Sequence, residues 1–137
     1  MNNQGKKILL VEDDKFLSEI LVKRLGESGE FDIKLSETAQ KALDLLEQET
    51  VDLILLDLIL PGMDGFEFLK RAKDNPKIST IPIIVLSNLS QETEIEKAKN
   101  LGAKDYLIKA NFTTKEIIEK IKVFIWFNET TNEMSIF

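Results

Sequence analysis

Cysteine and histidine are both absent from the 137 residues of this chain. Without cysteine there is no disulfide bond, no thiolate nucleophile and no cysteine-ligated zinc or iron–sulfur site. Without histidine, the imidazole base of the common catalytic triads and the commonest transition-metal ligand are excluded as well. Chemistry on this chain must therefore depend on carboxylates, lysine, hydroxyl groups or a hard cation that prefers oxygen ligands.

Long hydrophobic runs and an excess of positive charge are also missing. The first apolar run ends at Val11, which makes it too short for a signal peptide or a membrane span. We therefore expect no membrane insertion and a cytoplasmic location. The formal net charge of −6 argues against direct binding of nucleic acid, because such binding needs a basic face that displaces counterions.

Short apolar runs alternate with stretches of helical spacing. Runs without internal alternation are typical of strands buried on both faces of a parallel sheet. They occur at residues 8–11, 51–56, 81–86 and 106–108, and residues 31–35 alternate like an edge strand. Five strand–helix units predict an α/β fold, a doubly wound five-stranded parallel sheet with five helices.

Several helix signals lie between these runs. Ser90 is expected to cap the fourth helix, and the pattern from Thr113 to Glu116 is a capping box for the fifth. Asp14 is expected to start the first helix. The core stripe predicted for that first helix consists of Phe16, Ile20, Leu21 and Leu25.

Four large apolar residues occupy positions 124–127, near the end of the last predicted helix. Together they point all round the helix, although only one stripe can face the sheet. We expect Phe124 and Ile125 to face the core. Trp126 and Phe127 are then at least partly exposed as a partner surface, or covered by the chain end. The domain is expected to span residues 1–127, followed by a short polar tail, 128–137, that frays.

Polar side chains occur where four of the predicted strands end. Glu12 and Asp13 follow the first strand, Asp57 the third, Ser87 the fourth and Lys109 the fifth. Parallel sheets bind ligands outside these carboxyl ends. Three carboxylates at one edge repel one another and imply a hard, oxygen-bound cation, for which Mg²⁺ fits best. The lysine and the hydroxyl suit the oxygens of a phosphoryl group.

Each of these residues alone has an ordinary explanation. Glu12-Asp13-Asp14 could be a solvated loop that opens a helix, where acids favour the dipole. Asp57 could cap the loop that follows it, Ser87 could bond backbone, and Lys109 could be a surface lysine. Their joint occurrence at four strand ends is what favours a site.

Four segments, taken together, resemble the response-regulator receiver domain, the phosphoacceptor of bacterial two-component systems. They are residues 8–14, 56–65, 83–87 and 102–109, and the resemblance covers about residues 6–127. It implies a flavodoxin-like sheet of strand order 2-1-3-4-5. It also implies that Asp57 is the phosphorylated aspartate and that Glu12 and Asp13 help it to hold Mg²⁺. The backbone carbonyl of Ile59 matches a further metal ligand.

The resemblance also assigns a switch. Ser87 matches the hydroxyl that turns toward the phosphoryl group, Lys109 the lysine that pairs with it, and Tyr106 the aromatic side chain that changes rotamer. The backbone N–H of Asn88 is expected to bind a phosphoryl oxygen. Two further positions control dephosphorylation in the family. They are occupied here by Ile59 and Leu89, both apolar, and this predicts a long-lived phosphorylated state.

Two residues depart from the family pattern. Asn88 stands where the family often has a small residue, and Ala110 stands where the lysine is usually followed by proline after a cis bond. A cis bond before a residue other than proline costs about 2.5–4 kcal/mol. The bond between Lys109 and Ala110 is therefore either trans or cis at a cost, and the pose of Lys109 depends on which.

The implied function is a signalling switch that accepts a phosphoryl group from a sensor histidine kinase or a phosphotransfer protein. Phosphorylation would reshape the surface of the fourth helix, fifth strand and fifth helix, which binds a downstream protein; formation of a homodimer is left open. The chain would be no enzyme beyond its own phosphorylation and slow dephosphorylation. Because it ends soon after the fifth helix, we expect a stand-alone receiver.

Three other functions compete with this one. Phosphatases of the haloacid-dehalogenase type share the aspartyl nucleophile, Mg²⁺ and lysine, but they usually carry a second aspartate two residues after the nucleophile, where this chain has Ile59. A pseudo-receiver would bind protein without being phosphorylated, although all the polar positions are filled here. A flavin-binding fold of similar topology would need a phosphate-cradling loop after the first strand, which the sequence lacks.

Overall fold

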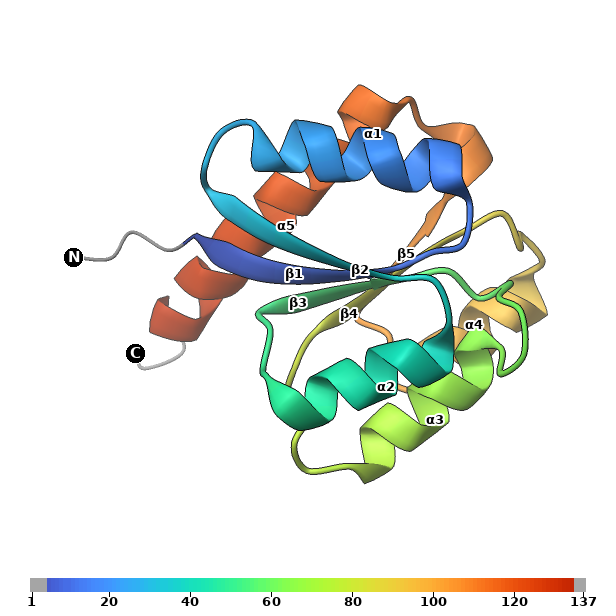
Figure 1. The fold of residues 1–137 in the computed structure, drawn as a ribbon. Coiled ribbons are helices and arrows are strands. Elements are labelled where there is room, and N and C mark those ends of the chain that lie inside the picture. The colour runs from blue at the N-terminus through green and yellow to red at the C-terminus, as the bar shows by residue number, and fades with distance from the viewer. Residues whose placement is uncertain (1–4, 135–137) are drawn as a thin grey trace.

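The computed structural model describes residues 5–134, and it describes side chains as far as Ile125. Five parallel strands form one sheet in the order β2-β1-β3-β4-β5 (Figure 1). The strands are β1 (Lys6–Val11), β2 (Phe31–Ser36), β3 (Leu53–Leu56), β4 (Ile83–Ser87) and β5 (Asp105–Ile108). The predicted fold class and strand order are therefore confirmed.

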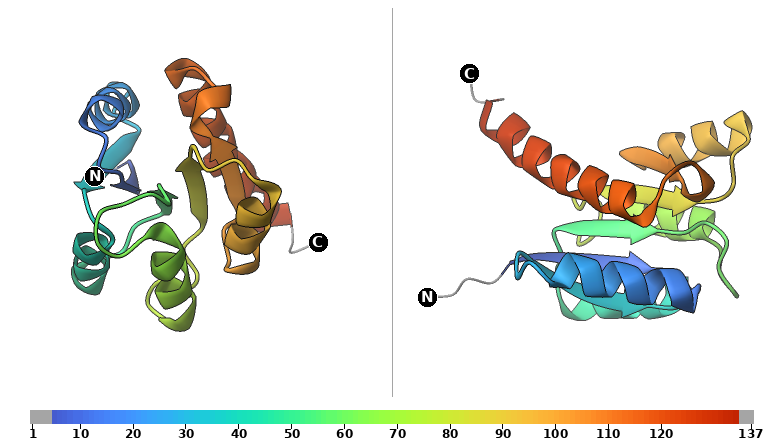
Figure 2. Two further views of the ribbon diagram at one scale, coloured as in Figure 1. Left: turned by 90° about the vertical axis from the view of Figure 1, so that its right-hand side faces the viewer. Right: turned by 90° about the horizontal axis from the view of Figure 1, so that it is seen from above.

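The helices cover both faces of the sheet, as the left view of Figure 2 shows. One face carries α1 (Lys15–Gly26) and α5 (Thr114–Met134). The other carries α2 (Ala39–Gln48), α3 (Gly65–Asp74) and α4 (Glu92–Asn100). A short 3₁₀ turn, η1 (Lys109–Asn111), joins β5 to α5. Within residues 5–134, no helix is long and apolar enough to cross a membrane.

The core consists of two apolar layers, one on each face of the sheet. Successive strand residues point to opposite faces, so a strand that is covered on both sides needs an unbroken apolar run. In β3, Ile54 and Leu56 pack toward α2, α3 and α4, while Leu53 and Leu55 pack toward α1 and α5. All four side chains are buried. This is why continuous apolar runs, rather than alternating ones, predict the central strands.

The helix starts follow the capping signals with one exception. Asp14 caps α1, because its Oδ1 accepts a hydrogen bond from the Leu17 N–H at 3.1 Å. The capping box of α5 is formed in both directions, at 2.8 and 3.1 Å. The prediction of Ser90 as the cap of α4 is wrong by one residue: the cap is Gln91, whose backbone N–H donates to the Glu94 side chain.

The core stripe predicted for α1 is also partly wrong. Phe16 is 75% exposed, whereas Leu21 and Leu25 are fully buried. Leu17 packs against the same layer, and with 3.6 residues per turn a face through Leu17, Leu21 and Leu25 leaves Phe16 outside it. In β2 the edge position is confirmed, but the predicted alternation holds only in part because Leu35 is exposed.

The last helix continues past residue 127, where we expected the frayed tail to begin, and ends at Met134. Phe124 and Ile125 pack against the layer between the sheet and α1, as predicted. The side chains of Trp126 and Phe127 lie outside the described part of the chain, so their exposure stays a prediction. The boundary at residue 127 is likewise untested.

Candidate functional site

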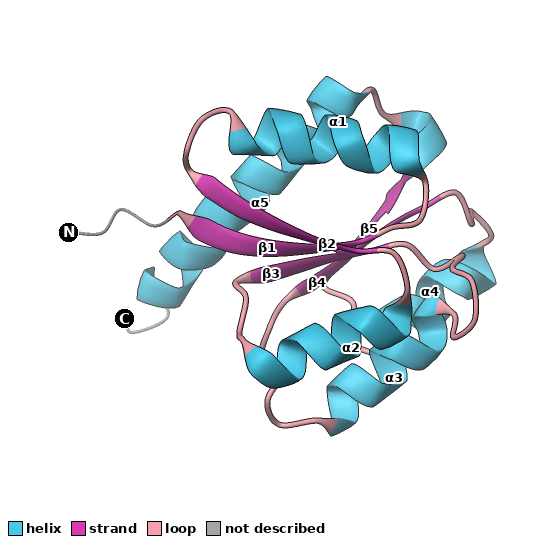
Figure 3. Cartoon of the chain, viewed as in Figure 1, coloured by secondary structure: helices cyan, strands magenta, loops and turns pink. Residues whose placement is uncertain are grey.

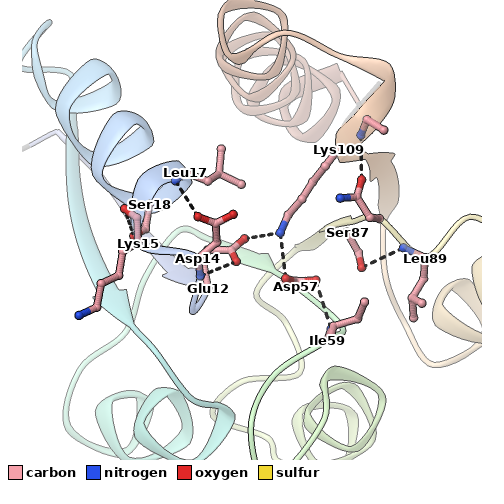
Figure 4. A network of polar contacts seen from close by, with 12 residues as sticks. Glu12, Asp14, Lys15, Leu17, Ser18, Asp57, Ile59, Ser87, Leu89 and Lys109 are labelled. Atoms are coloured by element: carbon pink, nitrogen blue, oxygen red, sulfur yellow. Dashed lines mark hydrogen bonds and ion pairs between the residues drawn. The ribbon is translucent and has the colours of Figure 1, made fainter.

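The carboxyl ends of the strands all lie at one edge of the sheet, opposite the start of β1 and the end of α5 (Figure 3). The register places Val11, Leu56 and Val85 in one row across β1, β3 and β4. The residues that follow this row therefore meet, and the Asp57 N–H donates to the Val11 carbonyl at 3.0 Å. Figure 4 shows Glu12, Asp57 and Lys109 converging at this edge.

Lys109 joins the two buried carboxylates of the site. Its Nζ lies 2.8 Å from Glu12 Oε1 and 2.9 Å from Asp57 Oδ2 (Figure 4). The second oxygen of each carboxylate accepts a backbone N–H two residues further on: from Asp14 at 3.0 Å and from Ile59 at 3.2 Å. Glu12 is 1% exposed and Asp57 5%. Apart from the ion pair, Glu12 Oε1 has no hydrogen-bond partner among the described residues.

This burial sets the protonation of the site. Burial raises the pKa of Glu12 to about 7, and the charge of Asp57 adds to that effect, while hydrogen bonds from Lys109 and the Asp14 N–H oppose it. Burial alone would lower the pKa of Lys109, but its hydrogen bonds and charge interactions with Glu12 and Asp57 outweigh burial and leave that pKa raised. At neutral pH Lys109 is therefore a cation and Glu12 is close to its titration point.

The carboxylates also form a group that fits a hard cation. One oxygen from each of Glu12, Asp13 and Asp57 lies within 4.8 Å of the others. A cavity of about 460 Å³ opens over them, and Ile59 and Lys109 also line it. Asp13 is exposed. An all-oxygen donor set beside an open cavity matches the ligand preference of Mg²⁺.

The loop between Asp57 and α3 is held close to the site by a glycine. The Gly65 N–H donates to the Leu58 carbonyl at 2.9 Å. A Cβ at Gly65 would lie 2.6 Å from Leu58 Cα and 2.7 Å from the Asp57 carbonyl oxygen, so a side chain at this position would push the loop away. The exposed Ile59 side chain stands on this loop, 55% exposed at the edge of the cavity.

Ser87 is fully buried, and its hydroxyl is engaged within its own loop. Its Oγ accepts the Leu89 N–H at 3.3 Å (Figure 4). Tyr106 is half-buried, and its hydroxyl donates to the Leu89 carbonyl at 2.6 Å. Burial raises the pKa of Tyr106, and the charge of Glu94 acts in the same direction. Ser87 and Tyr106 thus both hold the loop that follows β4.

The side chain of Asn88 makes a contact that sequence reasoning missed. The Ala110 N–H donates to Asn88 Oδ1 at 2.9 Å. All described peptide bonds are trans, including the one between Lys109 and Ala110, which settles the alternative left open above. Asn88 and Ala110 are the two residues that depart from the family pattern, but nothing in the sequence pairs them.

Comparisons with known proteins agree with this geometry. A family model described as the response regulator receiver domain matches residues 8–122. A CheY-like receiver domain protein from Methanospirillum hungatei is 27% identical, with a TM-score of 0.80 over 93% of this chain and 98% of that one. The Mn²⁺-bound form of response regulator Rcp1 is 31% identical, with a TM-score of 0.77 over 87% and 93%. The phosphorylated cyanobacterial phytochrome response regulator RcpA is 30% identical, with a TM-score of 0.75 over 88% and 91%.

Proposed function

The chain belongs to the response regulator receiver domain family, and we propose that it is a phosphorylation-activated switch whose phosphoacceptor is Asp57. The observation that carries this proposal is the position of Asp57. It is a buried carboxylate that pairs with Lys109, lies within the same carboxylate group as Glu12 and Asp13, and lines the cavity. The related RcpA was crystallised in its phosphorylated form, which supports the same chemistry here.

The phosphoryl donor in this proposal is a phosphohistidine on a sensor kinase or phosphotransfer protein. A carboxylate oxygen of Asp57 attacks the phosphorus, the P–N bond breaks, and its electron pair stays on the imidazole nitrogen. The product is an acyl phosphate on Asp57. Lys109 already contacts Asp57 Oδ2 and is placed to neutralise phosphoryl oxygens.

Glu12, Asp13, Asp57 and the backbone carbonyl of Ile59 would hold Mg²⁺. When bound, Mg²⁺ offsets the charge of the carboxylates and of the phosphoryl oxygens. The donor set fits, as described above, and the related Rcp1 has a Mn²⁺-bound form. Glu12 has to be ionised to act as a ligand, and its pKa of about 7 makes that possible at neutral pH.

The switch itself begins at Ser87. On phosphorylation its hydroxyl would leave the Leu89 N–H and bond a phosphoryl oxygen, while the Asn88 N–H takes a further charge-assisted bond. The loop after β4, which Tyr106 also contacts, would then move and change the surface of α4, β5 and α5. That surface would bind the downstream protein or a second copy of the chain, in the cytoplasm.

Intact-mass measurement tests the proposal. Acetyl phosphate with Mg²⁺ should add one phosphoryl group to the wild-type chain and none to Asp57→Asn, and EDTA should prevent the reaction. Equal labelling of Asp57→Asn would assign the phosphoacceptor elsewhere. Steady release of phosphate from a small phosphoester would favour a phosphatase, but the position of its general acid is held by the exposed, apolar Ile59.

A further inference from the structure

One hydrogen bond connects the loop after β4 with the turn after β5. The donor is the Ala110 N–H and the acceptor is Asn88 Oδ1, at 2.9 Å. Asn88 follows Ser87 directly, and Ala110 follows Lys109 directly. The bond therefore links the neighbours of the two residues that are expected to contact a phosphoryl group.

This bond continues the sheet by one step. The last paired row between β4 and β5 is Ser87 with Ile108. Beyond that row β4 and β5 have no further paired residues in the described structure. The side-chain oxygen of Asn88 takes the place of the next backbone acceptor. Lys109 lies between this row and the bond, so its backbone is fixed on both sides. Within η1 itself, Lys109 is held only by a long hydrogen bond, from the Phe112 N–H to the Lys109 carbonyl at 3.3 Å.

We propose that Asn88 is a positioning residue, which holds the turn after β5 so that the Lys109 ammonium group stays within reach of Asp57 and Glu12. That Asn88 restrains Lys109 follows from the geometry alone. That this restraint matters for phosphoryl transfer rests on the proposed function. The bond needs both residues, because a proline at 110 has no N–H to donate and a small apolar residue at 88 has no acceptor.

A purely steric role for Asn88 is the competing explanation, because its side chain also lines the cavity. The two roles predict opposite effects of shortening the side chain. If bulk matters, Asn88→Ala opens the cavity and speeds phosphorylation by a small donor. If the hydrogen bond matters, Asn88→Ala and the size-matched Asn88→Leu both slow it.

The matched control is Asn111→Ala. Asn111 is exposed on the same turn, and its side chain makes no hydrogen bond among those seen in residues 5–125. Two NMR measurements do not depend on activity: hydrogen exchange of the Ala110 amide, and ¹³C relaxation of the Lys109 side chain at Cε. The third measurement is the rate of phosphorylation by acetyl phosphate with Mg²⁺.

We expect both Asn88 variants to exchange the Ala110 amide faster and to be phosphorylated more slowly, each by about two- to tenfold, which corresponds to one ordinary hydrogen bond. The Lys109 Cε should become more mobile, and Asn111→Ala should change none of the three. In an Ala110→Pro background the donor is already gone, so Asn88→Leu should have no further effect on the rate or on Lys109.

The proposal is overturned if Ala110 exchange and Lys109 mobility in Asn88→Leu equal those of Asn111→Ala. It is also overturned if Asn88→Ala is phosphorylated faster than wild type while Asn88→Leu is not slowed. Failure of the wild-type chain to be phosphorylated would count against the proposed function instead, because the two NMR measurements still decide whether Asn88 restrains Lys109.

Discussion

Replacing Lys109 by methionine should destabilise the metal-free protein far more than breaking a surface ion pair of the same geometry. Methionine keeps most of the aliphatic length of lysine and removes the charge. The substitution leaves Glu12 and Asp57, both almost fully buried, beside each other without their cation. Taking away one partner of a buried ion pair is costly because the remaining charge is neither hydrated nor paired.

The structure supplies a control for this comparison. Lys77 Nζ lies 2.9 Å from Glu47 Oε1, the same separation as between Lys109 and Asp57, but those two side chains are 63% and 51% exposed. Exposed pairs contribute about 0–1 kcal/mol, whereas breaking a buried pair costs about 3–5 kcal/mol. Out of a total stability of about 5–15 kcal/mol for a domain, only the second loss is large.

Urea unfolding in EDTA at about pH 8 measures both costs. We expect the free energy of unfolding to fall by about 3–5 kcal/mol in Lys109→Met and by less than about 1 kcal/mol in Lys77→Met. The loss of unfolding free energy in Lys109→Met should be smaller at about pH 5, because the Glu12 carboxyl, whose pKa is about 7, is then protonated. Saturating Mg²⁺ should recover part of it by binding only the folded state.

Equal losses in the two methionine variants would refute this reasoning. Such a result would mean that water reaches the Glu12 and Asp57 carboxylates well enough to replace the ammonium group. The loss of unfolding free energy in Lys109→Met could also be the same at both pH values. That result would show that the ionised form of Glu12 is not what costs stability.

Three further predictions concern the other residues of the site. Asp57→Asn should abolish labelling by acetyl phosphate, as measured by intact mass. Replacing Ile59 by Asn together with Leu89 by Glu should speed loss of the phosphoryl group, because polar side chains can orient a water that the apolar pair excludes; an unchanged half-life would contradict this. The metal-free wild type should lose up to about 3 kcal/mol of stability as pH rises from 4.5 to 7, because the folded state binds the Glu12 proton more tightly than the unfolded state. Glu12→Gln should lack that loss in urea titrations.

The parts of the fold that sequence could predict are those set by short local runs. The unbroken apolar runs required strands covered on both faces, and parallel strands bring their carboxyl ends to one edge. Together these two facts predict that Glu12, Asp57 and Lys109 lie at one edge of the sheet. The roles of these residues in phosphoryl transfer stay predictions.

The orientation of α1 could not be derived in the same way. The predicted stripe held Leu21 and Leu25 correctly, but Phe16 fits the helical period as well as Leu17 does, so periodicity alone does not choose between these two. In the structure Leu17 packs in the apolar layer with Leu21 and Leu25, and Phe16 is exposed. The contact of Asn88 with Ala110 was out of reach for another reason, since it joins two loops 22 residues apart with no periodic pattern.

The charges of the site explain why phosphorylation of Asp57 would act on the loop after β4. With all carboxyls ionised, Glu12, Asp13 and Asp57 against Lys109 leave two negative charges, which a divalent cation would balance. An acyl phosphate replaces the single charge of Asp57 by about 1.5 to 2 charges, so new negative charge remains. The Ser87 hydroxyl accepts the Leu89 N–H, and the Leu89 carbonyl accepts the Tyr106 hydroxyl. Turning the Ser87 hydroxyl toward the phosphoryl group would free the Leu89 N–H and loosen the loop that Tyr106 contacts. The added charge would thereby reach β5, which carries Tyr106.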